Sequence, residues 1–368
     1  MSSKLKLSAA KRFYPCNSFK YIPQDDPLSI INRLFCGWVV RDRFNLLNKY
    51  LPFRIVDDCD IVPTAERHEL PDLMNQRARE LISLNKDIVV SWSGGVDSTG
   101  ILSALFLNNF DKKRLTVLCS PSARTEYKDL WDWLIEEKVN MRVCDYISSE
   151  FNSLREDQIL LTGWCADQLF GSNIFVRYPD TYFLPWIDGL RKCMKASRLF
   201  LSDKSYTLLE QIYSEYAKTL KIDLKYFCEF AWMYNFCIKY SYVREDAKLS
   251  CTDPEVRNRI YNFYDTMKFQ EYSMYNFYKI KEVNVNKINK FYKQPLKQYI
   301  YSFTNDDVYL KNKGKVNSWA LTSDRRDIDI VSVKDNTGYH VYTTKVKTDT
   351  PVALRNEVMK MYLKEEYL

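Results

Sequence analysis

Residues able to bind an anion gather at 93–98, where the sequence Ser-Gly-Gly-Val-Asp-Ser follows an apolar run. Gly94 and Gly95 can adopt backbone angles that are closed to other residues. Their amide groups, with those of a helix that starts near Ser98, are expected to point at one spot, and the helix dipole adds positive charge there. The hydroxyl groups of Ser93 and Ser98 supply further donors. This combination fits a phosphate group.

Asp97 is the informative residue of this turn, because a carboxylate repels phosphate unless a metal ion lies between them. The segment is not a P-loop, which ends in Lys-Ser/Thr, and it is not the dinucleotide-binding pattern G-x-G-x-x-G. We therefore expect Asp97 to bind a Mg²⁺ ion that bridges to phosphate oxygens. The alternative is that Asp97 only caps the following helix, as aspartate often does.

With its preceding strand and following helix, the segment S-G-G-V-D-S resembles the pyrophosphate-binding loop of the N-type ATP pyrophosphatase superfamily. Members of that superfamily cleave ATP between the α- and β-phosphates, hold pyrophosphate in this loop and pass AMP to a substrate oxygen. The resemblance implies ATP and Mg²⁺ as cofactors. The nucleotide-binding residues that it implies here are Ser91, Ser93, Gly94, Gly95, Asp97 and Ser98.

A second motif, L-L-T-G-W-C-A-D-Q-L-F-G-S-N at 160–173, also follows an apolar strand. It resembles the second ATP-site motif of the synthetase domain of asparagine synthetases and of β-lactam synthetase. The resemblance places Gly163 against the adenine or ribose and makes Asp167 the second Mg²⁺ ligand beside Asp97. Two carboxylates at the ends of neighbouring strands also suit an oxygen-only magnesium site on physical grounds. The residues that match the pattern are Thr162, Gly163, Ala166, Asp167, Leu169, Phe170 and Gly171.

Two positions of this motif depart from those families. Trp164 stands at the catalytic position, where asparagine synthetases have a glutamate and β-lactam synthetase has a tyrosine. A tryptophan offers one N–H donor and cannot act as a general base. Gln168 replaces the usual acidic residue. The resemblance therefore extends to the residues that would bind ATP, but it does not identify the substrate that would accept the AMP group.

The strand at 115–120 is expected to edge the adenine by the same resemblance, although a plain core strand would show the same pattern. Arg124 and Glu126 follow on a loop and either touch substrate or form a solvated pair. The residues expected nearest to the adenine are Leu118, Cys119 and Ser120.

A basic segment at 310–318 matches the place where these families carry an essential lysine, after segments at 261–276 and 292–300 that resemble theirs more loosely. Lys313 fits the spacing best and Lys315 is second. A lysine there would neutralise the negative charge that adenylation develops on the α-phosphate. The alternative is an exposed basic loop.

Apolar runs alternate with helical patterns after residue 85, which predicts an α/β fold with a Rossmann-like parallel sheet flanked by helices. The resemblance described above implies a sheet of the adenine nucleotide α-hydrolase type. The expected strands are 88–93, 115–120, 141–147 and 159–164. We place an N-terminal leader with short helices at 1–84, the ATP-pyrophosphatase domain at 85–320 and an extension at 321–368.

The half of the chain after residue 185 is predicted to be mostly helical, with helices at 205–220 and 224–246. The second of these is apolar nearly all round, which indicates burial. A pattern of alternating residues around Asp-Asn-Thr-Gly at 327–346 predicts a β-hairpin close to the C-terminus.

The composition limits location and metal chemistry. The ten cysteines form no C-x-x-C pair, and their apolar neighbours indicate reduced, buried thiols. With only His68 and His340 in the chain, a zinc site is not expected. The N-terminus has no apolar core of signal-peptide length, and no window is apolar enough for a membrane helix. We therefore expect a soluble, cytoplasmic protein that does not bind a membrane.

Three functions stay open at this point. The first is an AMP-forming ligase that adenylates a carboxylate and forms an amide with ammonia or an amine. Residue 2 is serine rather than the cysteine of glutaminase-linked members, so nitrogen would come from solution, from the substrate or from a separate amidotransferase. The second, consistent with the net charge of +7, is an enzyme that adenylates a nucleobase in tRNA or DNA. The third is a nucleotide-binding protein that has lost catalysis.

Overall fold

The computed structural model describes most of the middle of the chain and parts of both ends. The described residues are 6–7, 27–34, 43–44, 46, 54–55, 60, 62–144, 147–170, 174–240, 243–244, 248, 251, 253–277, 293–314, 328–335 and 338–345. The chain divides into two compact units, one formed by 63–179 with 250–323 and the other by 1–62, 180–249 and 324–368. The domain boundaries at 84 and 320 stay a prediction.

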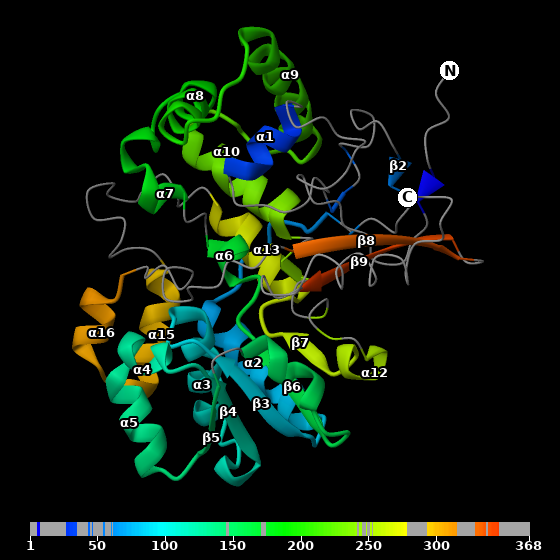
Figure 1. The fold of residues 1–368 in the computed structure, drawn as a ribbon. Coiled ribbons are helices and arrows are strands. Elements are labelled where there is room, and N and C mark those ends of the chain that lie inside the picture. Colours follow the sequence, from blue (N-terminus) through cyan, green and yellow to red (C-terminus); the bar gives the residue numbers. More distant parts are fainter. Residues whose placement is uncertain are drawn as a thin grey trace. The chain divides into compact units, whose positions relative to one another are not determined.

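The first unit is built on a five-stranded sheet in which every pair of neighbours is parallel (Figure 1). Its strands are β3 (Asp87–Trp92), β4 (Leu115–Cys119), β5 (Asn140–Val143), β6 (Gln158–Thr162) and β7 (Ile260–Asn262). The spatial order is β5-β4-β3-β6-β7. The first four strands confirm the predicted ones within a few residues, and the α/β class is confirmed.

Strand β7 was not predicted, and it is the correction to the expected sheet. Three residues are too few to show a period, and the sequence Ile-Tyr-Asn carries no distinctive strand signal. The strand forms because it pairs with β6, from Leu160 opposite Ile260 to Thr162 opposite Asn262. The Thr162 hydroxyl also donates a hydrogen bond to Asn262 Oδ1, 2.6 Å away, inside the core.

Helices pack around this sheet and bury most residues of its strands, apart from the edge strand β5, which is largely exposed. They are α2 (Leu70–Ser83), α3 (Val96–Leu107), α4 (Ser122–Glu126), α5 (Lys128–Glu136), α6 (Ala166–Phe170), α7 (Ile174–Arg177), α12 (Pro254–Arg257), α13 (Met267–Asn276), α15 (Gln294–Thr304) and α16 (Asp307–Asn312), with the 3₁₀ turns η2 (Lys112–Arg114) and η3 (Ile147–Ser153). Helix α3 is apolar on all sides because it lies between the sheet, α2 and α15. Phe106 of α3 contacts Trp133 of α5 edge-on and stacks on Phe303 of α15, with ring centroids 5.1 and 5.3 Å apart.

The strand order places a topological switch point between β3 and β6. From β3 the chain moves outward through β4 to β5, and it then returns to the other side of β3 as β6. Loops that follow the two strands at such a point diverge and leave a crevice at the carboxyl end of the sheet, where open α/β sheets bind ligands. Both sequence motifs follow these two strands.

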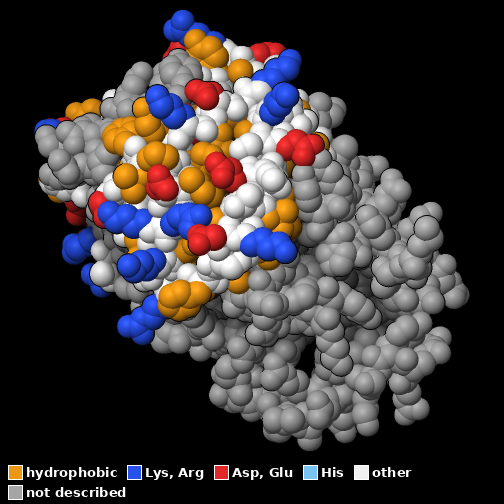
Figure 2. Space-filling model, turned by 90° about the horizontal axis from the view of Figure 1, so that it is seen from above, with side chains coloured by type: hydrophobic (Ala, Val, Ile, Leu, Met, Phe, Trp, Pro, Cys, Tyr) orange, Lys and Arg blue, Asp and Glu red, His pale blue; other side chains and the backbone are white. Residues whose placement is uncertain are grey.

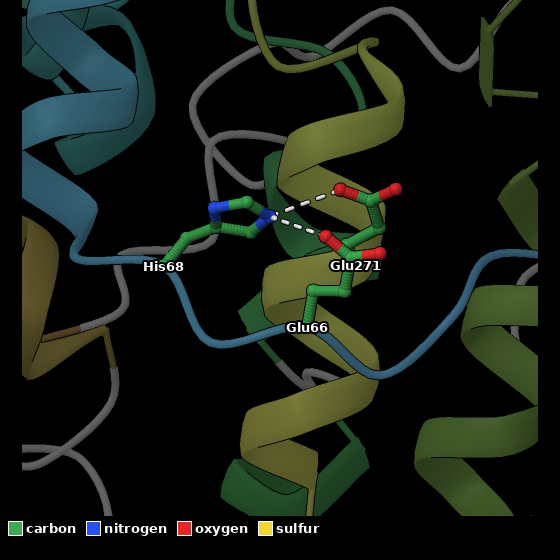
Figure 3. A group of neighbouring side chains, drawn as sticks. All are labelled: Glu66, His68 and Glu271. Atoms are coloured by element: carbon green, nitrogen blue, oxygen red, sulfur yellow. Dashed lines mark hydrogen bonds and ion pairs between the residues drawn. The ribbon is translucent and has the colours of Figure 1, made fainter.

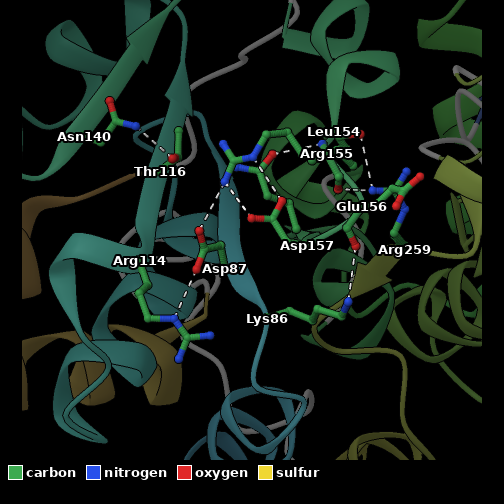
Figure 4. Close-up of polar contacts among 11 residues, drawn as sticks. Lys86, Asp87, Arg114, Thr116, Asn140, Leu154, Arg155, Glu156, Asp157 and Arg259 are labelled. Atoms are coloured by element: carbon green, nitrogen blue, oxygen red, sulfur yellow. Dashed lines mark hydrogen bonds and ion pairs between the residues drawn. The ribbon is translucent and has the colours of Figure 1, made fainter.

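The amino end of the sheet is closed by paired charges (Figure 4). Asp87 at the start of β3 accepts hydrogen bonds from Arg114 Nε at 3.1 Å and from Arg155 Nη2 at 3.2 Å. Arg155 also pairs with Asp157, 3.0 Å away. These pairs are partly exposed, so each contributes little to stability, but together they fix the chain segments that enter β3, β4 and β6.

The second unit is mostly helical. Its elements are α1 (Pro27–Leu34), the 3₁₀ turn η4 (Pro179–Thr181), α8 (Trp186–Ala196), α9 (Asp203–Thr219), α10 (Phe227–Tyr234), the π-helical turn η5 (Asn235–Lys239) and the two-residue parallel strands β1 (Lys6–Leu7) and β2 (Arg54–Ile55). The predicted buried helix is confirmed, because all eight residues of α10 are buried. Of the leader at 1–84, for which short helices were predicted, the segment 39–51 lies almost entirely outside the described residues.

An ion-pair cluster and an aromatic core stabilise this unit. Burial alone would raise the pKa of Asp60, but Arg244 and Arg43 pair with it and lower that pKa overall. Trp186 of α8 stacks on Phe230 of α10, with centroids 4.8 Å apart. A matched pair of large aromatic rings of this kind adds ~1 kcal/mol beyond the burial of its area.

The predicted hairpin is confirmed as β8 (Ile328–Asp335) and β9 (Gly338–Lys345), which pair antiparallel with Asp335 opposite Gly338 (Figure 1). On the face of the molecule seen from above, the described basic side chains are interspersed with acidic and apolar ones (Figure 2). None of the described helices is both long enough and apolar enough to cross a membrane.

Candidate functional site

The turn after β3 requires glycine at position 94. Gly94 has a φ of +75°, and a Cβ there would lie 2.6 Å from the carbonyl oxygen of Ala123 on α4. Both the left-handed backbone and the contact exclude any larger residue. The turn is therefore held tightly against α4, with its amide groups near the beginning of α3.

The serines of the turn hydrogen-bond to one another and to its backbone. The amide of Ser93 donates to Ser98 Oγ at 3.1 Å, and the amide of Gly95 donates to Ser93 Oγ at 3.3 Å. Thr99 N donates to Gly95 O at 3.0 Å and begins the helical pattern of α3. Hydroxyl groups so placed can turn toward an anion without moving the backbone.

Asp97 does not cap α3. The capping position is Gly95, no side chain caps the helix, and Asp97 lies in its first turn. Its backbone carbonyl accepts a hydrogen bond from the hydroxyl of Tyr264, 2.8 Å away. Complete burial raises the pKa of Tyr264 well above its ordinary value, so this tyrosine stays a neutral donor. The carboxylate of Asp97 is left to face the carboxyl end of the sheet.

The second motif lies directly against the first. A Cβ on Gly163 would lie 3.0 Å from the Cβ of Asp97 and 3.1 Å from the amide nitrogen of Ser98. Glycine at 163 thus allows the loop after β6 to touch the turn after β3. Asp167, in the first turn of α6, is brought to the same place as Asp97.

A lysine that the sequence analysis did not select lies between the two aspartates. Lys293 Nζ pairs with Asp97 Oδ1 and with Asp167 Oδ1, the latter at 2.6 Å. The Lys293 side chain is 1% exposed, whereas those of Asp97 and Asp167 are 23% and 32% exposed. The residue precedes α15 in a left-handed conformation, with φ of 54°. Two aspartates that share one cation are the arrangement expected at a cation-binding site.

The residues present fit a magnesium ion. Asp97 and Asp167 offer only oxygen atoms, reach the site from neighbouring strands and converge on one positive charge. Their partial exposure leaves room on the solvent side for phosphate oxygens or water, which Mg²⁺ retains in most protein sites. The ammonium of Lys293 shows where a cation is favoured.

Two more lysines lie near this end of the sheet. Lys297 on α15 is 1% exposed, and burial lowers its pKa to about 8, with added repulsion from Lys313 and Lys293. Lys313 follows α16 and pairs through Nζ with the carboxylate of Glu126, while its Nζ also donates to the Glu126 carbonyl oxygen at 2.8 Å. A polyanion such as a triphosphate would favour the charged form of Lys297, which the other two lysines repel.

Glu126 links the predicted lysine to the phosphate turn. The residue ends α4, and its Cβ lies next to the position where a Cβ of Gly94 would be. The Glu126 side chain is buried, so it is a partner of Lys313 rather than half of a solvated pair. Arg124 is exposed on the same helix. Lys315 lies outside the described residues.

The loop at 163–167 carries the departures from the expected pattern. Trp164 is half-buried in the turn between β6 and α6. Cys165 is buried and has φ of +74°, a conformation that costs a non-glycine residue ~1 kcal/mol or more. Gln168 is buried on α6.

The predicted adenine edge lies at the end of β4. Leu118 and Cys119 are buried, and Ser120 is half-buried just after the strand, with its hydroxyl 2.6 Å from that of Ser122. Burial raises the pKa of Cys119 to about 12, so its thiol stays protonated. Ser91 lies on β3 opposite Leu118. Only Ser120 of the three predicted adenine neighbours has a side chain partly open to solvent.

Lys293 and Lys297 are the residues that sequence reasoning missed. Their signal is the segment Tyr-Lys-Gln-Pro-Leu-Lys-Gln-Tyr-Ile, in which two lysines four residues apart fall among apolar residues that become buried. Lysine is rarely buried unless it has a function or a partner. The spacing could have marked them, but only the fold shows which carboxylates they meet.

Comparison with protein-family models gives no match for this chain, and comparison with curated protein sequences gives none either.

Proposed function

We propose that the chain is an ATP-dependent, AMP-forming ligase that adenylates a substrate carboxylate and then forms an amide, as asparagine synthetases do. The observation that carries the proposal is the convergence of Asp97 and Asp167 on one cation, the ammonium of Lys293, at the switch point, beside a glycine turn and two further lysines. This arrangement supports a site for a metal-bound polyphosphate. Both aspartates would hold Mg²⁺, which would neutralise phosphate charge when it is bound.

In the proposed reaction, a carboxylate oxygen of the substrate attacks the α-phosphorus of ATP. The bond from the α-phosphorus to the bridging oxygen breaks, and pyrophosphate leaves toward the turn at 93–98. The amide of Gly95, the hydroxyls of Ser93 and Ser98, and Lys297 stabilise the charge on the departing group. Lys313 would neutralise the α-phosphate, as the essential lysine of the similar families does. An amine then attacks the acyl carbon, AMP leaves, and the amine loses a proton to water or to a group outside the described residues.

The test is the identity of the products. Purified full-length protein would be incubated with ATP, Mg²⁺, ammonium and a panel of amino-acid and dicarboxylic acids, and phosphorus NMR would identify the nucleotide and phosphate products. The proposal requires AMP and pyrophosphate. Asp97→Asn and Asp167→Asn should each lower the rate on the order of 100-fold or more, whereas exposed Asp129→Asn should not change it. ADP with inorganic phosphate would refute cleavage at the α–β bond.

A nucleotide-binding protein without catalysis is the second candidate. It is favoured by Trp164, which replaces a catalytic side chain, and by Lys293, which already neutralises both aspartates. Tight binding of ATP without release of AMP, with every carboxylate and with nucleic acid, would favour this candidate. An enzyme that adenylates a nucleobase in tRNA or DNA is a further alternative, because the net charge of +7 would favour binding to nucleic acid. A gel shift that weakens with added salt would support it.

We also propose a reducing compartment such as the cytoplasm. The seven cysteines of the described part of the chain are all free, and six of them are buried. Their number and burial fit a protein that keeps its thiols reduced.

A further inference from the structure

Three potential metal ligands meet away from the nucleotide site (Figure 3). Glu66 and His68 lie on the segment before α2, two residues apart, and Glu271 projects from α13. His68 Nε2 lies 2.9 Å from Glu271 Oε2 and 4.0 Å from Glu66 Oε2. Both carboxylates thus point at the same ring nitrogen, although their residues are about two hundred positions apart in sequence.

These separations suit a zinc ion. Zinc binds histidine nitrogen and carboxylate oxygen at ~2.0–2.2 Å, which puts neighbouring ligand atoms of a tetrahedral site roughly 3.3–3.5 Å apart. The two separations at His68 lie on either side of that value, and all three ligand atoms fall within 4.8 Å of one another. Shifts of less than about 1 Å, within reach of glutamate side chains, would complete the geometry.

The charges of the cluster also favour a dication. Two carboxylates face one imidazole, and no lysine or arginine of the described ranges pairs with either of them. The nearest candidate on α13, Lys268, instead donates to Gln76 Oε1 at 2.9 Å, and Arg67 turns to Glu69. A divalent ion would neutralise the two carboxylates together.

A neighbouring hydroxyl orients one of the ligands. Thr64 Oγ1 donates a hydrogen bond to Glu66 Oε1 at 2.9 Å, which leaves Oε2 directed at His68. Metal-binding carboxylates are commonly held in this way by a partner that does not touch the metal, and loss of the partner lowers affinity.

We propose that Glu66, His68 and Glu271 bind one zinc ion, with water as the remaining ligand. The three-ligand set of nitrogen and oxygen is one that zinc accepts, and it leaves a coordination position open. The ion would fasten the segment before α2 to α13. That helix in turn touches α6, where Ser273 Oγ donates to the carbonyl oxygen of Leu169 at 2.8 Å. The site is independent of the proposed ligase activity.

The test is metal binding by the full-length protein, freed of metal and kept reduced. Competition with a chromophoric zinc chelator should give one tight site per chain, and cobalt(II) should give a ligand-field spectrum without a sulfur-to-cobalt charge-transfer band. His68→Ala should abolish the site, and Glu66→Gln should weaken it at least tenfold. Thr64→Val should weaken it by ~10–100-fold. His340→Ala is the matched control, since it removes the other histidine of the chain and should bind zinc as the wild type does.

The proposal fails if wild-type protein binds no zinc at micromolar concentration. It also fails if His340→Ala loses the site, or if cobalt binding shows thiolate ligands from the ten cysteines. Should His68→Ala misfold, Glu66→Gln decides the matter, because the Glu66 side chain is 58% exposed and its replacement leaves packing intact. Unchanged affinity in a folded Glu66→Gln variant would overturn the assignment.

Discussion

Replacing Lys293 by methionine would remove the one ammonium group shared by Asp97 and Asp167 while keeping nearly the same side-chain volume. Loss of one partner from a buried ion pair costs ~3–5 kcal/mol. Both aspartates are partly exposed, so water offsets some of that loss and we expect ~2 kcal/mol. In a unit of this size such a change corresponds to a Tm lower by ~4–8 °C.

The measurement is a thermal melt of wild type and Lys293→Met, first with EDTA and then with excess Mg²⁺. Without Lys293 a dication meets two carboxylates that have lost the ammonium group they shared. Mg²⁺ should therefore raise the Tm of the variant more than that of the wild type, since ligand binding to the folded state is stabilising by mass action. Lys311→Met is the control, because the pair of Lys311 with Asp307 is exposed and its loss should change the Tm little.

Two results would refute this reasoning. If Lys293→Met has the same Tm as the wild type in EDTA, the pairing of Lys293 with both aspartates does not stabilise the fold. If the variant is destabilised and yet Mg²⁺ raises both melting temperatures equally, Asp97 and Asp167 do not form the cation site, and the magnesium assignment falls with it.

Three further predictions concern stability. The pKa of Lys297 is lowered from 10.5 to about 8, so its charge opposes folding by up to ~3 kcal/mol below pH 8. The wild type should gain stability relative to Lys297→Met as pH rises from 8 to 10.5, which urea unfolding at both limits would show. Gly94→Ala should lower the unfolding free energy by ~2 kcal/mol or more, whereas Gly314→Ala, whose Cβ meets nothing within 4 Å, should be near neutral in the same assay. Because φ at position 165 is +74°, a Cys165→Gly variant should be more stable to unfolding than a Cys165→Ala variant by ~1 kcal/mol in urea titrations. Equal unfolding free energies of the two variants would mean that this backbone is not strained.

The sequence predicted those parts of the fold whose pattern is local. The strands β3, β4, β5 and β6 are apolar runs ending in turn residues, and so they could be identified from neighbouring residues alone. Strand β7 could not, because its three residues become a strand only by pairing with β6. Asp97 and Asp167 were paired through the resemblance of their two motifs to a known ATP site, with which their place after two strands agreed, and the order of the sheet confirms that those strands are neighbours.

The lysines and the histidine cluster escaped prediction for a different reason. Lys293 and Lys297 follow Asp97 by about two hundred residues, and a charged residue in a helix ordinarily faces solvent. Their burial is decided by the packing of α15 against α3, which no local pattern encodes. A zinc site was not expected because the chain has only two histidines, His68 and His340; the fold places two glutamates beside His68, which the sequence did not indicate.

The two ends of the sheet differ in how their charged side chains are compensated. At the amino end, Asp87 lies between Arg114 and Arg155, and opposite charges compensate one another within the described residues. At the carboxyl end, Lys297 is buried and repelled by Lys293 and Lys313, which lowers its pKa. Asp97 and Asp167 pair with Lys293, and Glu126 pairs with Lys313, but burial of the charge on Lys297 opposes folding. A polyanion would offset that cost, and the cost falls at the carboxyl end of the sheet beside the switch point, where open α/β sheets bind ligands; this is the physical reason to expect a phosphate-bearing ligand there.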